Sequence, residues 1–169
     1  ELIEKATQWA DYIRTGHLNR HEAKTAMNTT IMKSLQYPLP ALTLNKEQCR
    51  SIQRIVINAG LPNGGTCRNY PRAALFGPKN EGGLGMDDLY QYQGTSRIAI
   101  IQEHIHAKTI TGEMLRTSIE AAKIEIGVGR NIFELEYKKF GALLTECWIK
   151  EVWKFADENG IIIIDEVTK

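Results

Sequence analysis

Residues 44–60 read LNKEQCRSIQRIVINAG and predict a capped amphipathic helix. Asn45 precedes the helix and Gln48 stands three residues on, a reciprocal pattern in which each side chain bonds the other residue's backbone N–H. The apolar residues of the predicted face recur at helical spacing and are Cys49, Ile52, Val56 and Ala59. We expect the helix to end at Gly60 and Pro62, because glycine tolerates a left-handed terminus and proline cannot donate a backbone hydrogen bond.

The same signals recur along the chain and predict a mainly α fold, a helical bundle of about six helices. Asn19 and Glu22 repeat the reciprocal capping pattern before a second helix, which Pro38 should end. Asp87 is expected to cap a later helix. The remaining expected helices cover residues 2–15, 89–106, 115–126 and 144–158.

Two regions depart from this helical pattern. Residues 62–85 form a Gly/Pro-rich central loop region with room for one or two helical turns between Pro71 and Pro78. Ile161–Ile164 predicts a short C-terminal strand, for which no other segment offers a partner. That mismatch, with Glu1 in the place of Met, leads us to expect a piece of a larger fold. We place a division between a helical region at 1–108, containing the loop, and a truncated helical region at 109–169.

The composition is that of a globular protein of 169 residues, with 43% hydrophobic and 24% charged residues. The longest aliphatic run has four residues, so no membrane span is expected. The odd number of cysteines (Cys49, Cys67 and Cys147) argues against a disulfide framework. An intracellular location, in cytoplasm or nucleus, follows as an expectation.

Charge is divided unevenly along a chain whose net charge is +1. Residues 1–80 carry 11 Lys+Arg and 5 Asp+Glu, a net of +6, and residues 81–169 carry 10 and 15, a net of −5. Lys46, Arg50 and Arg54 fall within a stripe of about 80° on one helix edge. Such a stripe suits successive phosphates, although a merely solvated helix face has the same pattern.

The basic surface has candidates outside this stripe. Arg68 and Arg72 flank Tyr70 in the central loop, where guanidinium groups suit phosphates and the ring suits a base or ribose. The alternative is that these arginines tie the loop to a carboxylate such as Glu81. Arg20 and Lys24 lie on the second predicted helix and extend the candidate nucleic-acid-binding set.

Other chemistries have no supporting pattern in the sequence. The glycine clusters lack the Walker spacing, and the histidine pairs His17/His21 and His104/His106 lack companion ligands at metal-site spacing. No serine or cysteine stands in a nucleophile motif, so we expect no catalytic residue and no metal site.

Met86-Asp87-Asp88 is similar to the paired aspartates that hold two magnesium ions in reverse-transcriptase active sites. Residues 91–97 make a poor strand, whereas the metal-binding pair belongs on a tight hairpin between strands. Asp11, the possible third carboxylate, falls in a helical pattern. Helix capping is therefore the favoured interpretation, and a two-metal polymerase or nuclease site at Asp87 and Asp88 is the disfavoured one.

Several motifs occur in a characteristic order. They are Tyr37-Pro38-Leu39-Pro40-Ala41-Leu42, Leu61-Pro62, Cys67-Arg68, Pro71-Arg72-Ala73-Ala74-Leu75-Phe76-Gly77-Pro78 and Gly82-Gly83-Leu84-Gly85. Together they resemble the post-palm region, the thumb and connection, of non-LTR-type retrotransposon reverse transcriptases, from about Trp9 to Trp153.

The resemblance implies a non-catalytic fragment of an RNA-directed DNA polymerase that holds template–primer nucleic acid through phosphates without reading sequence. It also implies partnership with the palm of the parent polypeptide, whose own magnesium ions this piece would not hold. From the residues alone, a helical protein-interaction module that meets an acidic partner stays an alternative.

Overall fold

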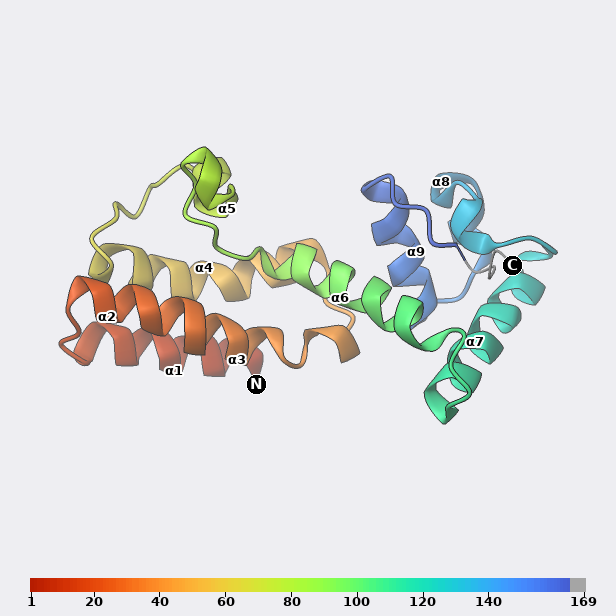
Figure 1. The fold of residues 1–169 in the computed structure, drawn as a ribbon, viewed down its shortest axis with the longest axis horizontal. Coiled ribbons are helices and arrows are strands. Elements are labelled where there is room, and N and C mark those ends of the chain that lie inside the picture. The colour runs from red at the N-terminus through yellow and green to blue at the C-terminus, as the bar shows by residue number, and fades with distance from the viewer. Residues whose placement is uncertain (165–169) are drawn as a thin grey trace. The chain divides into compact units, whose positions relative to one another are not determined.

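The computed structural model describes residues 1–164 and confirms a mainly α fold (Figure 1). Within this part of the chain the residues divide into two compact units, 1–93 and 94–164 as far as they are described. No helix among the described residues is long and apolar enough to cross a membrane.

The first unit is built on three long helical segments (Figure 1). Helix α1 packs along α4, and the helix formed by α2, the π-helical segment η1 and α3 contacts both. The unit ends with the first turns of α6. Its elements are α1 (Leu2–Thr15), α2 (Arg20–Thr25), η1 (Ala26–Ile31), α3 (Met32–Gln36), η2 (Leu39–Ala41), α4 (Lys46–Asn63), α5 (Arg72–Phe76), η3 (Lys79–Glu81) and α6 (Leu89–His104).

Both predicted capping boxes are present in the structure. Asn19 and Glu22 exchange their hydrogen bonds at 2.9–3.0 Å, and Asn45 and Gln48 exchange theirs at 2.9 Å. Each box starts a helix whose apolar face is buried in the core of the first unit. The core of this unit includes Ala6, Ala10, Ile13, Ala23, Met27, Ile31, Leu35, Ile52 and Val56.

The predicted end of α4 at Gly60 and Pro62 is wrong, because the helix continues to Asn63. Gly60 is instead needed for packing: a Cβ at this position would collide with the sulfur of Met27 on η1. The glycine thus lets two helices approach closely, a role that only the folded chain reveals.

As far as it is described, the second unit contains the remaining turns of α6 and five further elements, of which α7 and α9 have more than ten residues. Gly94 of α6 lies against the Phe155 ring, and the Arg97 guanidinium lies 5.9 Å from the centroid of the Trp148 ring. The elements are α7 (Ile110–Ile126), η4 (Ile132–Glu134), α8 (Tyr137–Phe140), η5 (Gly141–Leu143) and α9 (Trp148–Glu158).

Two sequence-based expectations differ from this architecture. The division at residue 108 falls in the turn after α6, whereas the compact units divide at residue 93, because the later turns of α6 pack on α9 residues such as Phe155. Ile161–Ile164 is not a strand, and no described segment is. Without a partner strand, Ile163 is buried and its carbonyl accepts from Asn131 at 2.8 Å.

Candidate nucleic-acid interface

The basic edge of α4 faces solvent as the sequence predicted. Lys46, Arg50 and Arg54 are all exposed, while the opposite side of the helix is buried in the core. Arg50 pairs with Glu47 at 3.0 Å, and both side chains are more than half exposed. Such a surface pair is weak, so Arg50 stays available to a stronger anion. The Lys46 ammonium lies 5.8 Å from the centroid of the Tyr90 ring.

Helix α5 brings a third arginine to this edge from the central loop. Backbone N–H groups of Leu84 and Met86 donate to the carbonyls of Ala74 and Leu75 at 2.8 and 3.1 Å. Leu75 is fully buried. These bonds fix the short helix in place, and Arg72 at its first position is exposed.

The three arginines line one open pocket of about 440 Å³. Arg50 and Arg54 contribute from α4, and Arg72 contributes from α5. The other lining residues are Gln53, Ile57, Ala73, Phe76 and Asp88. Three guanidinium groups therefore border the pocket with one carboxylate, and within residues 1–164 neither Arg54 nor Arg72 forms an ion pair. This arrangement favours an anion with several oxygens, because the planar guanidinium presents parallel donors.

The carboxylate of Asp88 has a structural task of its own. Its Oδ1 accepts from the backbone N–H groups of Tyr90 and Gln91 at 2.9 and 3.0 Å. Asp88 thus caps α6, and the expectation that Asp87 does so is wrong by one residue. The cap uses carboxylate lone pairs that would otherwise compete for the arginines.

Gln53 forms the polar floor of the pocket and joins α4 to α6. Its side-chain amide donates to the carbonyl of Asp87 at 2.6 Å, and its oxygen accepts from the N–H of Leu89 at 3.2 Å. The side chain is 3% exposed and both of its polar ends are satisfied. Gln53 therefore stiffens the pocket and has little capacity left for a ligand.

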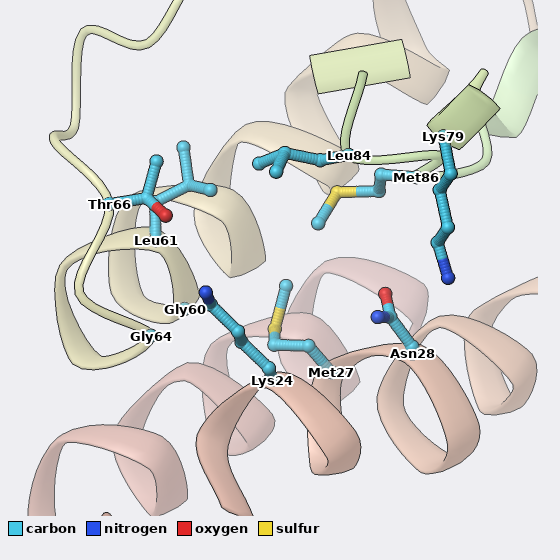
Figure 2. Close-up of a pocket in the computed structure, with 10 residues that line it drawn as sticks. All are labelled: Lys24, Met27, Asn28, Gly60, Leu61, Gly64, Thr66, Lys79, Leu84 and Met86. Atoms are coloured by element: carbon cyan, nitrogen blue, oxygen red, sulfur yellow. The ribbon is translucent and has the colours of Figure 1, made fainter. Parts of the chain in front are cut away.

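The rest of the predicted site lies elsewhere on the unit. Arg68 is exposed in the loop before α5 and does not border this pocket, and Tyr70 is half-buried. Arg20 lies against Gly65, and Lys24 lines a different pocket beside Gly64 (Figure 2). Neither Arg68 nor Arg72 pairs with Glu81 within residues 1–164, so the loop-tie alternative finds no ion pair there.

Sequence reasoning missed Phe76 and Gln53. Phe76 was seen only as part of a short helical turn, and Gln53 lies on α4 with no distinguishing neighbour in sequence. The one available signal for Phe76 is its spacing of four from Arg72, which places both on one side of a helical turn.

The two carboxylates of the aspartate pair have different hydrogen-bond partners. One Asp87 oxygen, Oδ2, accepts from Gln36 at 2.6 Å and from Lys33 at 3.1 Å. Burial raises the pKa of Asp87, but the hydrogen bonds from Gln36 and Lys33 and the charge of Lys33 lower it below 3.8 overall. Asp11 pairs with Arg14 on α1. Among the described residues, no three His, Cys, Asp or Glu side chains gather as metal ligands.

Comparisons of the chain with known protein families, curated proteins and solved structures give no match.

Proposed function

We propose that the first unit binds nucleic acid through its phosphates, without reading base sequence, as the thumb of a reverse transcriptase would. The observation that carries the proposal is the convergence of Arg50, Arg54 and Arg72 on one open pocket. Guanidinium–phosphate contacts depend on charge and geometry that every nucleotide shares, so such binding tolerates any sequence.

Phe76 adds a second kind of contact to the same pocket. It is a half-buried aromatic residue that borders the space between the arginines. Aromatic rings stack on unpaired bases of any identity. A nucleotide with its phosphate on the arginines and its base at Phe76 satisfies both chemistries, which favours substrates with an unpaired segment next to a duplex.

The proposed role does not include catalysis. Asp87 accepts hydrogen bonds from Lys33 and Gln36, and Asp88 caps α6. With these partners the two aspartates do not fit a pair of magnesium ions. In a parent polymerase, the palm would carry the magnesium ions and the catalytic residues, and this region would bind the template–primer.

Fluorescence anisotropy with a labelled RNA–DNA hybrid tests the proposal. We expect the affinity to fall about forty-fold between about 50 and about 200 mM salt if three phosphates are contacted, using the slope for duplex DNA. The variant Arg50→Ala/Arg54→Ala/Arg72→Ala should bind weakly with a flatter salt dependence. Its matched control is Lys108→Ala/Arg130→Ala/Lys138→Ala, which removes three exposed cations from the second unit.

Two results would contradict this function. Absence of binding at low salt would remove its premise. Equal affinity of the two triple variants would show that the arginine pocket is not the contact, and would favour an acidic protein partner for the same arginines.

A further inference from the structure

A second pocket, of about 200 Å³, lies between η1, the last turns of α4 and the segment 79–86 (Figure 2). It is separate in its lining from the arginine pocket. The residues that border it are Lys24, Met27, Asn28, Gly60, Leu61, Gly64, Thr66, Lys79, Leu84 and Met86.

The interior of this pocket is apolar and rich in sulfur. Met27, Leu61 and Met86 are at least nine-tenths buried, and Leu84 is half-buried. Figure 2 shows the methyl ends of Met27 and Met86 turned toward the same space. Methionine sulfur makes favourable contacts with aromatic rings, so this lining suits an aromatic body better than a purely polar one.

The polar groups of the pocket are cationic or neutral. Lys24 and Lys79 stand on either side of the two methionines in Figure 2, with Asn28 beside Lys79. No acidic residue borders the pocket. Within residues 1–164 neither lysine forms an ion pair. Two ammonium groups without a counter-charge favour an anionic ligand.

Glycines hold the side chains of this pocket in position. A Cβ at Gly64 would lie 3.1 Å from Cγ of Lys24, and a Cβ at Gly85 would lie 2.9 Å from Cγ of Lys79. Met27 fills the corresponding space over Gly60. The stems of both lysines therefore lie against backbone at the edge of the pocket, while both residues stay exposed to solvent.

We propose that this pocket binds a small aromatic anion, with its ring between Met27 and Met86 and its anionic group at one of the two lysines, Lys24 or Lys79, that stand on either side of the methionines. The volume sets the size: a cavity of about 150 Å³ accepts benzene, so about 200 Å³ accepts a single ring with a small charged group. Pockets that enclose drug-sized ligands measure about 300–1,000 Å³, which is larger than this one.

Methionine methyl NMR tests this assignment on the whole chain. The four methionines give two reporters in the pocket, Met27 and Met86, and two controls outside it, Met32 and Met114. Phenyl phosphate and benzoate are the probes, and their relative affinities show whether the anionic group is a phosphate or a carboxylate. We expect saturable shifts of the Met27 and Met86 signals with at least one probe, while Met32 and Met114 stay unchanged.

The lysines are tested by the variant Lys24→Gln/Lys79→Gln, which should weaken binding about tenfold or more, as expected for hydrogen bonds to charged groups. The control Lys108→Gln/Lys138→Gln makes the same change of net charge in the second unit and should bind as the unaltered chain does.

Four outcomes would overturn the proposal. They are no shift with either probe, equal shifts at all four methionines, equal affinity for phenol or inorganic phosphate, and unchanged affinity in the Lys24/Lys79 variant. None of these measurements uses nucleic acid, so they stand apart from the test of the arginine pocket.

Discussion

The side-chain amide of Gln53 donates to the carbonyl oxygen of Asp87 across 2.6 Å, and this bond connects the middle of α4 to the start of α6. The same side chain accepts from the N–H of Leu89. Gln53 also borders the pocket of Arg50, Arg54 and Arg72. The position of α4 relative to the start of α6, and with it the shape of this pocket, therefore depends on one buried glutamine.

Replacing Gln53 should destabilise the first unit. The change Gln53→Ala leaves the Asp87 carbonyl and the Leu89 N–H without their partner, at a cost of about 1–3 kcal/mol. Hydrogen exchange of the amides in α4 and at the start of α6 measures the effect. Gln8→Ala, at an exposed position of α1, is the control and should change exchange little. Equal exchange in both variants would contradict the role given to Gln53.

Arg54 and Arg68 should differ in nucleic-acid binding although both are exposed arginines. Arg54 borders the pocket and Arg68 does not. We expect Arg54→Ala to lower affinity for an RNA–DNA hybrid at low salt and to reduce the salt slope by roughly 0.9, the value for one lost phosphate contact. Arg68→Ala should keep the slope. Anisotropy titrations at several salt concentrations compare them, and a larger loss at Arg68 would place the contact in the loop instead.

Phe76→Leu should distinguish substrates with and without an unpaired segment. Leucine keeps most of the apolar volume but cannot stack on a base. We expect about tenfold weaker binding to a hybrid with a single-stranded overhang, within the range of one lost base–aromatic stack. Binding to the blunt hybrid should be unchanged.

The matched control for Phe76 is Phe140→Leu, a half-buried phenylalanine of the second unit. If Phe76→Leu weakens both substrates equally, the ring supports the pocket without meeting a base.

Gly60→Ala should destabilise the first unit through Met27. The added methyl group would collide with the Met27 sulfur, and such overpacking costs about 1–3 kcal/mol. In a Met27→Ala background the collision is gone, so the same change should be neutral or stabilising by up to about 1 kcal/mol, the helix propensity of alanine over glycine. Hydrogen exchange of the amides in α1 and α4 measures the stability of the unaltered chain, the two single variants and the double variant.

Gly129→Ala serves as the control in that cycle, because a Cβ there meets nothing within 4 Å. A destabilisation by Gly60→Ala that persists without Met27 would show that the backbone, not the sulfur, requires the glycine.

Acid should reduce the stabilisation of the folded chain that the Asp87 carboxylate provides. Its pKa is lower in the folded chain than its ordinary 3.8, because the hydrogen bonds from Gln36 and Lys33 outweigh the opposing effect of burial. The stabilisation is therefore present above the ordinary pKa and is lost as the pH falls through the lower pKa of the folded chain. Thermal unfolding followed by circular dichroism measures the melting temperatures of the unaltered chain and of Asp87→Asn. The difference between them should become smaller from about pH 6 to about pH 3.

The control variant is Asp11→Asn, which removes the carboxylate of an exposed ion pair on α1. It shows how much the melting temperature changes with pH when an exposed carboxylate is lost. A gap between Asp87→Asn and the unaltered chain that stays constant with pH would mean that Lys33 and Gln36 do not favour the charged carboxylate.

Local signals predicted the parts of the fold that local bonds create. The capping boxes at Asn19 and Asn45 need only four consecutive residues, and both are present. The close approach of Met27 to Gly60 joins residues that are 33 apart, so no short window of sequence shows why a glycine stands inside α4. Ile161–Ile164 has the composition of a strand, but a strand needs a partner that the described chain does not supply.

The candidate site was predictable in part for the same reason. Arg50 and Arg54 share a helix edge, and helical geometry alone brings them together. Arg72 joins them only because hydrogen bonds from residues 84–86 hold α5 over α4. The presence of Lys24 and Lys79 at one pocket likewise requires the folded loop, and nothing in the spacing of these two lysines indicates it.

The π-helical segment η1 decides which residues the helix it interrupts presents to the interior. Counted in ordinary α-helical steps from Ala23, the inward positions would pass through Thr30 and Ser34. The wider π-helical turn contains one extra residue, which moves each later inward position one residue along the chain. Ile31 and Leu35 are therefore buried, and Thr30 is exposed. If this turn closed to an ordinary α-helical one with the sequence unchanged, Thr30 and Ser34 would replace Ile31 and Leu35 on the buried side of the downstream helix. Removal of one residue from the turn would instead keep Ile31 and Leu35 buried, because the wide turn holds one residue more than an α-helical turn.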